Sequence, residues 1–449
     1  MTSLTDSLSR FVVNPSFPNL PERAVKIVQS GFIDTIATMI AGQNVPVVAI
    51  VRQFVEERKS AAREARVLLG HEMAASADAA LINGTAAHAL DYDDVALSGH
   101  PSTVLVPAVL AEGERLNVSG SEAIRAYLVG YEVWAELLSR EQDAYHVKGW
   151  HPTAVLGTIG TAAAVAYLHK LSAEQCRNAI AIAASMASGL VANFGTMTKP
   201  LHAGRAAACG VEAVRLAASG LTGAMDVMEH HAGYLAALSP NGRTDPSSAA
   251  LTLGKKLRVL ESGLSIKKYP MCYATHRVID GLLDLIGAHD VKPADVMEIR
   301  ACIGGAQASM LRNHAPVTGL EAKFSLEFGI ASALVARKVG LAELTDSFVA
   351  EPTLRQLMTK VKISTTDVPC PIEPVFALND RVVVLLRDGR TIDSGEIRFA
   401  RGNAMLPLHD EELKAKFVDC ASVSAGLDGA GLYRQLSNLT ELKSLRELA

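Results

Sequence analysis

The apolar residues of this 449-residue chain change their spacing near Lys267. Before that point, from Pro21 to about Ser265, they recur at the period of one helix face. After it, between residues 296 and 399, several short runs alternate between apolar and polar side chains, which is the pattern of strands. Helical spacing returns after Pro407. The sequence therefore predicts a mainly α protein in which a smaller α+β part is inserted into a large helical part built from both chain ends.

Length and composition fit this division. A chain of 449 residues is too long for one typical hydrophobic core. Hydrophobic residues make up 49% of the chain and aromatic residues only 5%, so Ala, Val and Leu must fill most of the interior. Such small side chains let helices pack closely. We place the helical domain at residues 1–267 and 400–449, and the α+β domain, a candidate lid, at residues 268–399.

Some elements can be placed from their ends. Ser119-Gly-Ser-Glu122 and Ser172-Ala-Glu-Gln175 each match a capping box and predict the start of a helix. Arg387-Asp-Gly-Arg390 lies between two alternating runs and predicts a β-hairpin turn. In the α+β domain we expect strands at 296–303, 361–365, 381–386 and 391–399, and helices at 323–339 and 341–348. We expect further helices at 407–421 and 432–448.

Several classes of protein are disfavoured by the composition. A net charge of −4 gives no electrostatic case for nucleic-acid binding. Residues 1–15 include Asp6 and Arg10 and lack the apolar core of a signal peptide. The apolar stretch at 179–194 is short and interrupted by polar residues, which favours a buried helix over a membrane span. Six scattered cysteines, with no C-x-x-C pair, favour reduced thiols. We expect a cytoplasmic protein that binds neither membrane nor nucleic acid.

One segment, residues 195–207, has the features of an anion site. Lys199, His202 and Arg205 follow one another at intervals of three at the start of a predicted helix. Free backbone N–H groups and the helix dipole favour an anion at that end, and three cation-capable side chains add to the effect. The alternative is an ordinary surface helix with solvated Lys and Arg and a packed His. The sequence leaves both open.

A second polar segment runs from His88 to Thr103. It holds three acidic residues within four positions, Asp91, Asp93 and Asp94, and then His100 before a proline. Such carboxylates can fix the tautomer of a histidine or bind a metal ion. The spacing suits metal ligands poorly, so we predict no metal. The acidic residues could instead serve only as helix caps.

Two further segments add candidate groups. His151 precedes Pro152 at the start of a predicted helix, where a structural role is the plainer reading. Lys267, Lys268 and His276 lie where the two predicted domains join, and a cleft between domains is a common ligand site. A lysine desolvated in such a cleft has a lowered pKa. The alternative is a basic linker.

Taken together, these residues favour proton transfer at a carbon next to a carboxylate. No nucleophile elbow, P-loop or dinucleotide-binding fingerprint occurs in the sequence. Lysine and histidine would neutralise the carboxylate so that a carbanion can form, and a neighbouring group would deliver or remove the proton.

Six segments, in this order along nearly the whole chain, resemble the signature blocks of the MmgE/PrpD family: 88–103, 149–153, 195–207, 268–277, 321–326 and 407–417. The resemblance implies a large helical domain with an α+β lid, a homodimer, and catalysis without a metal or organic cofactor. By position it implies the catalytic residues Asp91, His100, His151, Lys199 and Lys268. As substrate-binding residues we predict His202, Arg205, Tyr145, Lys267 and His276.

The family includes 2-methylcitrate dehydratase, cis-aconitate decarboxylase and iminodisuccinate epimerase. Val95 stands where the dehydratase and decarboxylase branches have Thr, and the loop 96–99 is shorter than in the decarboxylase. A lost hydroxyl removes one hydrogen bond to substrate or water. We therefore expect a dehydratase of the 2-methylcitrate type first, an epimerase using Tyr145 second, and the decarboxylase last. A catalytically silent carboxylate-binding protein is the alternative that is not an enzyme.

Overall fold

The computed structural model describes residues 3–17, 19–373 and 376–448 and divides the chain into two compact units. One unit consists of Met1–Ser265 and Leu413–Ala449, and the other of Ile266–Glu412. The prediction of a mainly helical fold with an inserted α+β part is confirmed. The chain returns to the helical unit at Leu413, later than the predicted residue 400. The reason is that Ile397 pairs with Asp380, and the carbonyl of Gly402 accepts a hydrogen bond from Ile266, all within the second unit.

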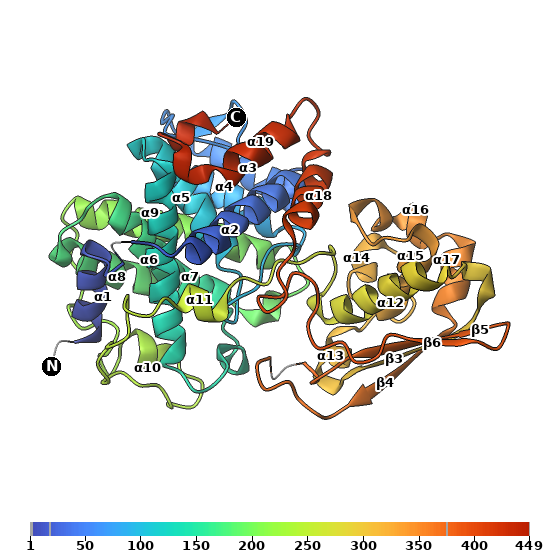
Figure 1. The fold of residues 1–449 in the computed structure, drawn as a ribbon. Coiled ribbons are helices and arrows are strands. Elements are labelled where there is room, and N and C mark those ends of the chain that lie inside the picture. Colours follow the sequence, from blue (N-terminus) through green and yellow to red (C-terminus); the bar gives the residue numbers. More distant parts are fainter. Residues whose placement is uncertain (1–2, 18, 374–375, 449) are drawn as a thin grey trace. The chain divides into compact units, whose positions relative to one another are not determined.

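The helical unit is a bundle in which segments from both chain ends lie together. In Figure 1 its C-terminal helices, in red, lie beside the N-terminal helix α2, in blue. The helices of this unit are α1 (Leu4–Val13), α2 (Glu22–Gly42), α3 (Pro46–Glu57), α4 (Ser76–His88), α5 (Ser102–Leu116), α6 (Gly120–Ser139), α7 (Pro152–Leu168), α8 (Ala173–Met186), α9 (Thr198–Ala218), α10 (Tyr234–Leu238), α11 (Arg258–Ser262), α18 (Asp410–Ala421, from the end of the second unit) and α19 (Gly429–Ser437). Two short strands, β1 (Ala65–Arg66) and β2 (Met73–Ala74), pair antiparallel.

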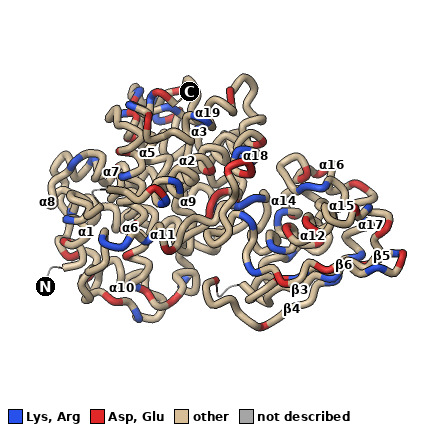
Figure 2. The backbone as a smooth tube through the Cα atoms, in the orientation of Figure 1, with Lys and Arg blue, Asp and Glu red and all other residues tan. Residues whose placement is uncertain are grey.

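Small residues let the central helices of this unit approach closely. Helix α7 packs against α6, α8 and α9, and α9 packs against α4. A Cβ added at Gly204 of α9 would lie 2.2 Å from the carbonyl oxygen of Leu81 in α4, so glycine is required at this crossing. Helix α7 carries no charged residue, and Figure 2 shows its tube in tan. The close packing expected from the low aromatic content is therefore present.

The predicted helix starts and ends can be compared directly. Both capping boxes form, at Ser119 and at Ser172. Helix α9 begins at Thr198, so Pro200 lies in its first turn. Gly220 follows the end of α9 with φ +97°, as expected for a helix stop.

Helix α2 is the one helix among the described residues that is long and apolar enough to cross a membrane by length and composition. The model buries 72% of its most apolar window, which is typical of the core helix of a globular unit. Near its middle lies the fully buried Asp34, an ionisable group inside this core.

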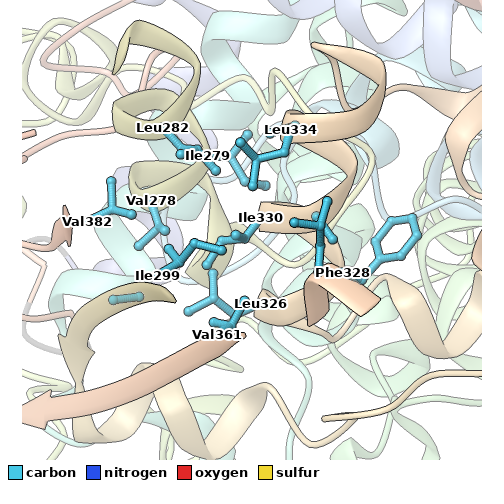
Figure 3. Packing of buried hydrophobic residues seen from close by; sticks show 14 of the residues in the cluster. Val278, Ile279, Leu282, Ile299, Leu326, Phe328, Ile330, Leu334, Val361 and Val382 are labelled. Atoms are coloured by element: carbon cyan, nitrogen blue, oxygen red, sulfur yellow. The ribbon is translucent and has the colours of Figure 1, made fainter. Parts of the chain in front are cut away.

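The second unit is a four-stranded sheet with helices on it. The strand order is β4-β3-β5-β6, with β3 parallel to β4 and antiparallel to β5. The apolar residues of α12 and α15 pack on the sheet around Ile299, Val361 and Val382 (Figure 3). The elements are α12 (His276–His289), β3 (Val296–Gly304), α13 (Gly305–Met310), α14 (Gly319–Ala322), α15 (Leu326–Ala336), α16 (Asp346–Val349), α17 (Pro352–Met358), β4 (Val361–Thr366), β5 (Arg381–Leu386) and β6 (Thr391–Asp393).

The predicted strands of this unit form, but the last is shorter than expected. The Asp-Gly hairpin connects β5 to β6, and Gly389 has φ +88°. Strand β6 ends at Asp393 because Ser394 and Gly395 turn the chain away, and Gly395 has φ +66°. The predicted helix at 341–348 is a 3-10 turn followed by the short α16.

Candidate functional site

The loop between α4 and α5 brings two histidines onto one carboxylate. His88 is the last residue of α4, and its Nδ1 lies 2.9 Å from Asp93 Oδ1. His100, two residues before α5, has its Nδ1 2.7 Å from Asp93 Oδ2 and 2.9 Å from the carbonyl oxygen of Asp94. The two rings lie 4.4 Å apart between centroids. Asp93 therefore holds both imidazoles and orients their Nε2 atoms.

Burial dominates the electrostatics of this loop. Burial lowers the pKa of His88 to about 4, against the opposing charge of Asp93. For Asp93, burial alone would raise the pKa, but the two histidines and their hydrogen bonds hold it well below its ordinary value. At neutral pH the loop therefore contains a carboxylate and a neutral His88.

Lys199 joins this loop from α9. It lies in the first turn of the helix, and its Nζ donates a hydrogen bond of 2.8 Å to Asp91 Oδ1. The same oxygen lies 3.9 Å from His100 Nε2. Asp91 adopts φ 51°, in the left-handed region that Asp tolerates better than most residues. The structure thus brings together three of the predicted catalytic residues.

His151 and His202 form a second pair. His151 caps the start of α7, and its backbone N–H donates to the carbonyl oxygen of Gly189. The Nδ1 atoms of His151 and His202 lie 3.1 Å apart. Burial lowers the pKa of both rings, and the charge of Lys199 lowers both further. These imidazoles are therefore uncharged at neutral pH.

Ring contacts place this pair next to the loop. The rings of His88 and His151 stack at 6.3 Å between centroids. Phe194 meets His151 edge-on at 4.8 Å, and Lys199 Nζ lies 5.4 Å from the centroid of the same phenyl ring. His88 and Phe194 were missing from the predicted site residues. The signals that the sequence offers for them are their positions: His88 begins the polar segment 88–103, and Phe194 directly precedes the segment 195–207.

A buried polar network supports the loop from behind. Asp94 accepts a hydrogen bond from Ser102, whose hydroxyl also lies 2.7 Å from Tyr127 Oη. Lys416 of α18 donates to the carbonyl oxygen of Tyr92 at 2.8 Å, and its Nζ lies 2.5 Å from Asp34 Oδ1. Lys416 lies in the segment 407–417 that resembles a family block, and the sequence alone indicates no role for it. No spacing pattern could have linked it to the loop.

The turn before His100 has an unfavourable backbone. Ala96 and Gly99 exchange two backbone hydrogen bonds, which leaves Leu97 and Ser98 as the two central residues of a tight turn. Both have positive φ, 49° and 59°, a conformation that glycine and asparagine adopt more easily. Such strain recurs at functional sites. Val95, the residue noted as a departure, exchanges two backbone hydrogen bonds with Ser265.

Four groups of this cluster have atoms that suit a metal ion. Their ligand atoms lie within 4.8 Å of one another, and they belong to His88, Asp91, Asp93 and His100. The Nδ1 atoms of both histidines already contact Asp93, and the Lys199 ammonium group contacts Asp91. A positive charge at this position would oppose a bound cation. The absence of a metal stays a prediction.

Two of the predicted substrate-binding residues, both in the helical unit, have no described side-chain contact with this cluster. Arg205 pairs with Glu212 of the same helix at 3.7 Å, and its side chain is 47% exposed. It lines a groove of about 510 Å³ together with apolar residues of α3 such as Ile50 and Phe54. Tyr145 is buried, and burial followed by the charge of Glu141 raises its pKa. Among the described contacts, no hydrogen bond or ring contact joins Tyr145 to His151.

The other predicted residues belong to the second unit. Lys268 Nζ donates to Glu412 Oε1 at 2.6 Å, and Lys267 is buried. The ring of His276 lies 5.1 Å from both Tyr269 and Tyr273. Each contact lies within the unit. The prediction that these residues share a substrate with Lys199 stays a prediction.

Comparisons with known proteins identify the family of this chain. Residues 6–247 match the MmgE/PrpD N-terminal domain, and residues 269–430 match the MmgE/PrpD C-terminal domain. The cis-aconitate decarboxylase of Homo sapiens is 28% identical over 458 residues, which cover 99% of this chain and 93% of that protein. The protein of the same name from Mus musculus is 31% identical over 353 residues, covering 76% and 70%. That from Aspergillus terreus is 25% identical over 313 residues, covering 64% of each chain.

Proposed function

Because the chain belongs to the MmgE/PrpD family, we propose that it is a lyase acting on a small di- or tricarboxylic acid through a carbanion next to a carboxylate. The comparisons support the lyase class. The observation that carries the proposal is the Lys199–Asp91 ion pair at 2.8 Å, in a helical unit where burial keeps the nearby imidazoles of His88 and His151 uncharged.

The chemistry follows from these groups. Lys199 can exchange Asp91 for a carboxylate of the substrate, because both partners offer the same negative oxygen atoms. The negative charge that develops on the neighbouring carbon is then spread toward a carboxylate paired with an ammonium group. An imidazole can remove a proton from that carbon or return one to it. His100 and His151 are the candidates, since Asp93 and His202 respectively contact their Nδ1 atoms and leave Nε2 for the reaction.

Decarboxylation of a cis-aconitate-like tricarboxylate is the first reaction to test. The sequence placed it last because of Val95 and the shorter loop, but the relatives described above are cis-aconitate decarboxylases, which moves it to first place. In this reaction the bond to one carboxylate breaks, carbon dioxide leaves, and the electron pair on carbon takes up a proton.

Dehydration of the 2-methylcitrate type is the second candidate. It uses the same carbanion, but a proton leaves the carbon and water departs from its neighbour. The sequence observation that favours it over decarboxylation is the loop 96–99, which is shorter than in the decarboxylase. Epimerisation is less supported, because Tyr145 contacts neither pair of histidines among the described hydrogen bonds and ring contacts.

The reaction can be identified by NMR in deuterated water. Purified protein would be incubated separately with cis-aconitate, 2-methylcitrate, citrate and iminodisuccinate. Carbon dioxide and a deuterated five-carbon unsaturated diacid indicate decarboxylation, and loss of water indicates dehydration. Deuterium at the α-carbon without either loss indicates epimerisation. No reaction with any of the four, together with binding of a tricarboxylate, would favour the silent carboxylate-binding protein over this proposal.

We also propose a cytoplasmic location, which the six scattered cysteines favour. The resemblance implies a homodimer that works without a metal or organic cofactor, and we propose both. The support is the family membership itself. Light scattering coupled to gel filtration tests the dimer, since a mass near 47.5 kDa would indicate a monomer instead.

A further inference from the structure

We propose that His151 and His202 form a two-imidazole proton relay, in which His202 supplies the proton that His151 gives to the carbanion. This inference rests on the proposed function and assigns His202 a role in proton transfer in place of the predicted contact with substrate. His151 immediately precedes α7, and His202 lies in the second turn of α9.

The distance between the rings requires a shared proton. The two Nδ1 atoms lie 3.1 Å apart, which is a hydrogen-bond distance, so one nitrogen carries a hydrogen and the other offers a lone pair. If both rings are neutral, they must then be opposite tautomers. The ring with the hydrogen on Nδ1 has a bare Nε2, and the other ring has a hydrogen on Nε2. The pair therefore presents one base and one donor.

The surrounding residues fix this arrangement. His151 is 2% exposed and His202 is 8% exposed. A Cβ added at Gly189 would lie 3.3 Å from Nδ1 of His202 and 2.5 Å from the Cβ of Ala154. The carbonyl oxygen of the same glycine accepts the backbone hydrogen bond of His151. Gly189 thus lets the two rings meet by the absence of its side chain.

The charges that face the pair keep it neutral. His151 is influenced by His88, His100, Lys199 and His202, and His202 by Lys199. Burial and the charges of these groups disfavour an additional proton on either ring. In the neighbouring loop, the carboxylate of Asp91 is paired with Lys199 and that of Asp93 with the other two histidines. These surroundings therefore favour proton transfer in which neither ring carries a net charge.

The transfer balances as follows. Before the reaction His202 carries the hydrogen on Nδ1 and His151 carries it on Nε2. The N–H bond at His151 Nε2 breaks as the new C–H bond forms, and the proton on His202 Nδ1 moves to His151 Nδ1. Water donates a proton to His202 Nε2, and the hydroxide that remains returns to the solvent. One solvent proton has then reached the carbon, both rings are neutral, and their tautomers have exchanged. Transfer in the reverse direction would carry a proton from a substrate carbon to solvent.

The first test needs no substrate. Histidine labelled with 15N would be incorporated into the wild type, and the variants His151→Gln and His202→Gln would assign the two rings. At neutral pH we expect two neutral rings of opposite tautomer, with a coupling between the two Nδ1 atoms through the shared hydrogen. Two rings of the same tautomer, or a doubly protonated ring, would overturn the relay whatever reaction the protein catalyses.

The second test uses whichever substrate the wild type turns over. We expect His202→Gln, which can still donate a hydrogen bond to His151 but cannot pass a proton on, to lower kcat about 10²-fold with little change in KM. The plot of wild-type rate against deuterium fraction should curve, as two moving protons require, and become linear in His202→Gln. Added imidazole should restore part of the rate of His202→Ala.

His231→Gln, which changes an exposed histidine of the same unit, serves as the matched control. A folded His202→Gln protein with wild-type kcat and an unchanged isotope plot would show that His202 only positions its neighbour. In that case the lyase activity of the wild type would still support the proposed function. Absence of turnover by the wild type, in contrast, would count against the function and not against the tautomers seen by NMR.

Discussion

Lys416 of α18 donates a 2.8 Å hydrogen bond to the carbonyl oxygen of Tyr92, between the two acidic residues that hold Lys199 and the histidines. Its ammonium group also lies 3.8 Å from the centroid of the Tyr92 ring and 2.5 Å from Asp34 Oδ1. A residue near the C-terminus therefore supports the loop that carries Asp91 and Asp93.

We expect Lys416→Met to lower both the stability and the activity. Removing one partner of a buried ion pair leaves Asp34 charged and desolvated, at a cost of about 3–5 kcal/mol in the free energy of unfolding. Urea denaturation followed by circular dichroism would measure this loss. Adding Asp34→Leu should recover most of the stability but not the activity. Lys414→Met, an exposed change in the same helix, is the control. Equal stability of Lys416→Met and the control would contradict the assigned role.

Replacement of Lys199 by Ala should cost most of the rate. A charge-assisted contact in a desolvated site contributes about 2–4 kcal/mol, or roughly 10²–10³ in kcat/KM. Steady-state kinetics on the active substrate would measure the effect, with Lys255→Ala, at an exposed position, as control. Asp91→Asn should preserve the left-handed backbone while removing the charge that holds Lys199 in the free enzyme. Wild-type kinetics in a folded Lys199→Ala protein would exclude an anion site at this helix end.

Activity should survive exhaustive treatment with EDTA or phenanthroline. The Lys199 ammonium group, 2.8 Å from Asp91, opposes a cation among the four potential ligands. Rates measured before and after chelation should agree. A loss that is reversed only by Fe²⁺, Zn²⁺ or Mg²⁺ would reassign His88, Asp91, Asp93 and His100 as a metal site.

The stability of the wild type should depend on His88 between pH 6.5 and pH 4. Burial lowers the pKa of this ring from 6.5 to about 4. Between these pH values His88 binds a proton in the unfolded chain but not in the folded protein. The free energy of unfolding therefore falls as the pH falls. The shift in the pKa of His88 corresponds to a loss of about 3 kcal/mol in the free energy of unfolding.

The measurement compares His88→Gln with the wild type by denaturation at several pH values. A comparison is needed because burial raises the pKa of Asp94, and that of Glu132 to about 7, which acts in the opposite direction. The variant should lose less stability than the wild type between pH 6.5 and pH 4. Parallel curves for the two proteins would contradict a neutral, buried His88.

The turn before His100 should gain stability from residues that favour positive φ. Leu97→Asn combined with Ser98→Gly removes unfavourable left-handed backbone at two positions, and we expect a gain of about 1–2 kcal/mol in the free energy of unfolding. Thermal denaturation would measure it. Ser98→Pro is the informative opposite change, because proline cannot adopt φ 59°. A gain from the proline variant would show that the turn has another conformation.

The elements of the fold were largely predictable because local signals specify them. Capping residues at Ser119 and Ser172 fixed two helix starts, and the Asp-Gly pair at 388–389 fixed a hairpin. The later return of the chain to the helical unit was not predictable. It depends on backbone pairing of Ile397 with Asp380 and of Gly402 with Ile266, which join residues far apart in sequence.

The sequence indicated which segments contribute to the site, but it did not indicate which residues contact one another. Lys199 and Asp91 lie in different polar segments, and only packing of α9 on α4 shows that they meet. The sequence predicts Arg205 as a substrate-binding residue because it follows Lys199 by two steps of three residues. Each step turns by about 300° around a helix, so two steps carry the side chain about 120° away from Lys199. It therefore faces α3.

The position of Lys416 also bears on when during synthesis the protein can become active. Ribosomes deliver a chain from its N-terminus, and domains tend to fold as they emerge. Asp91, His100, His151 and Lys199 are all made before residue 200, yet the lysine that supports their loop from α18 is made more than 200 residues later. A nascent chain therefore contains the reactive groups long before it can hold them in register. Premature termination before Leu413 would yield a protein with every predicted catalytic residue but without the lysine that supports the loop from α18.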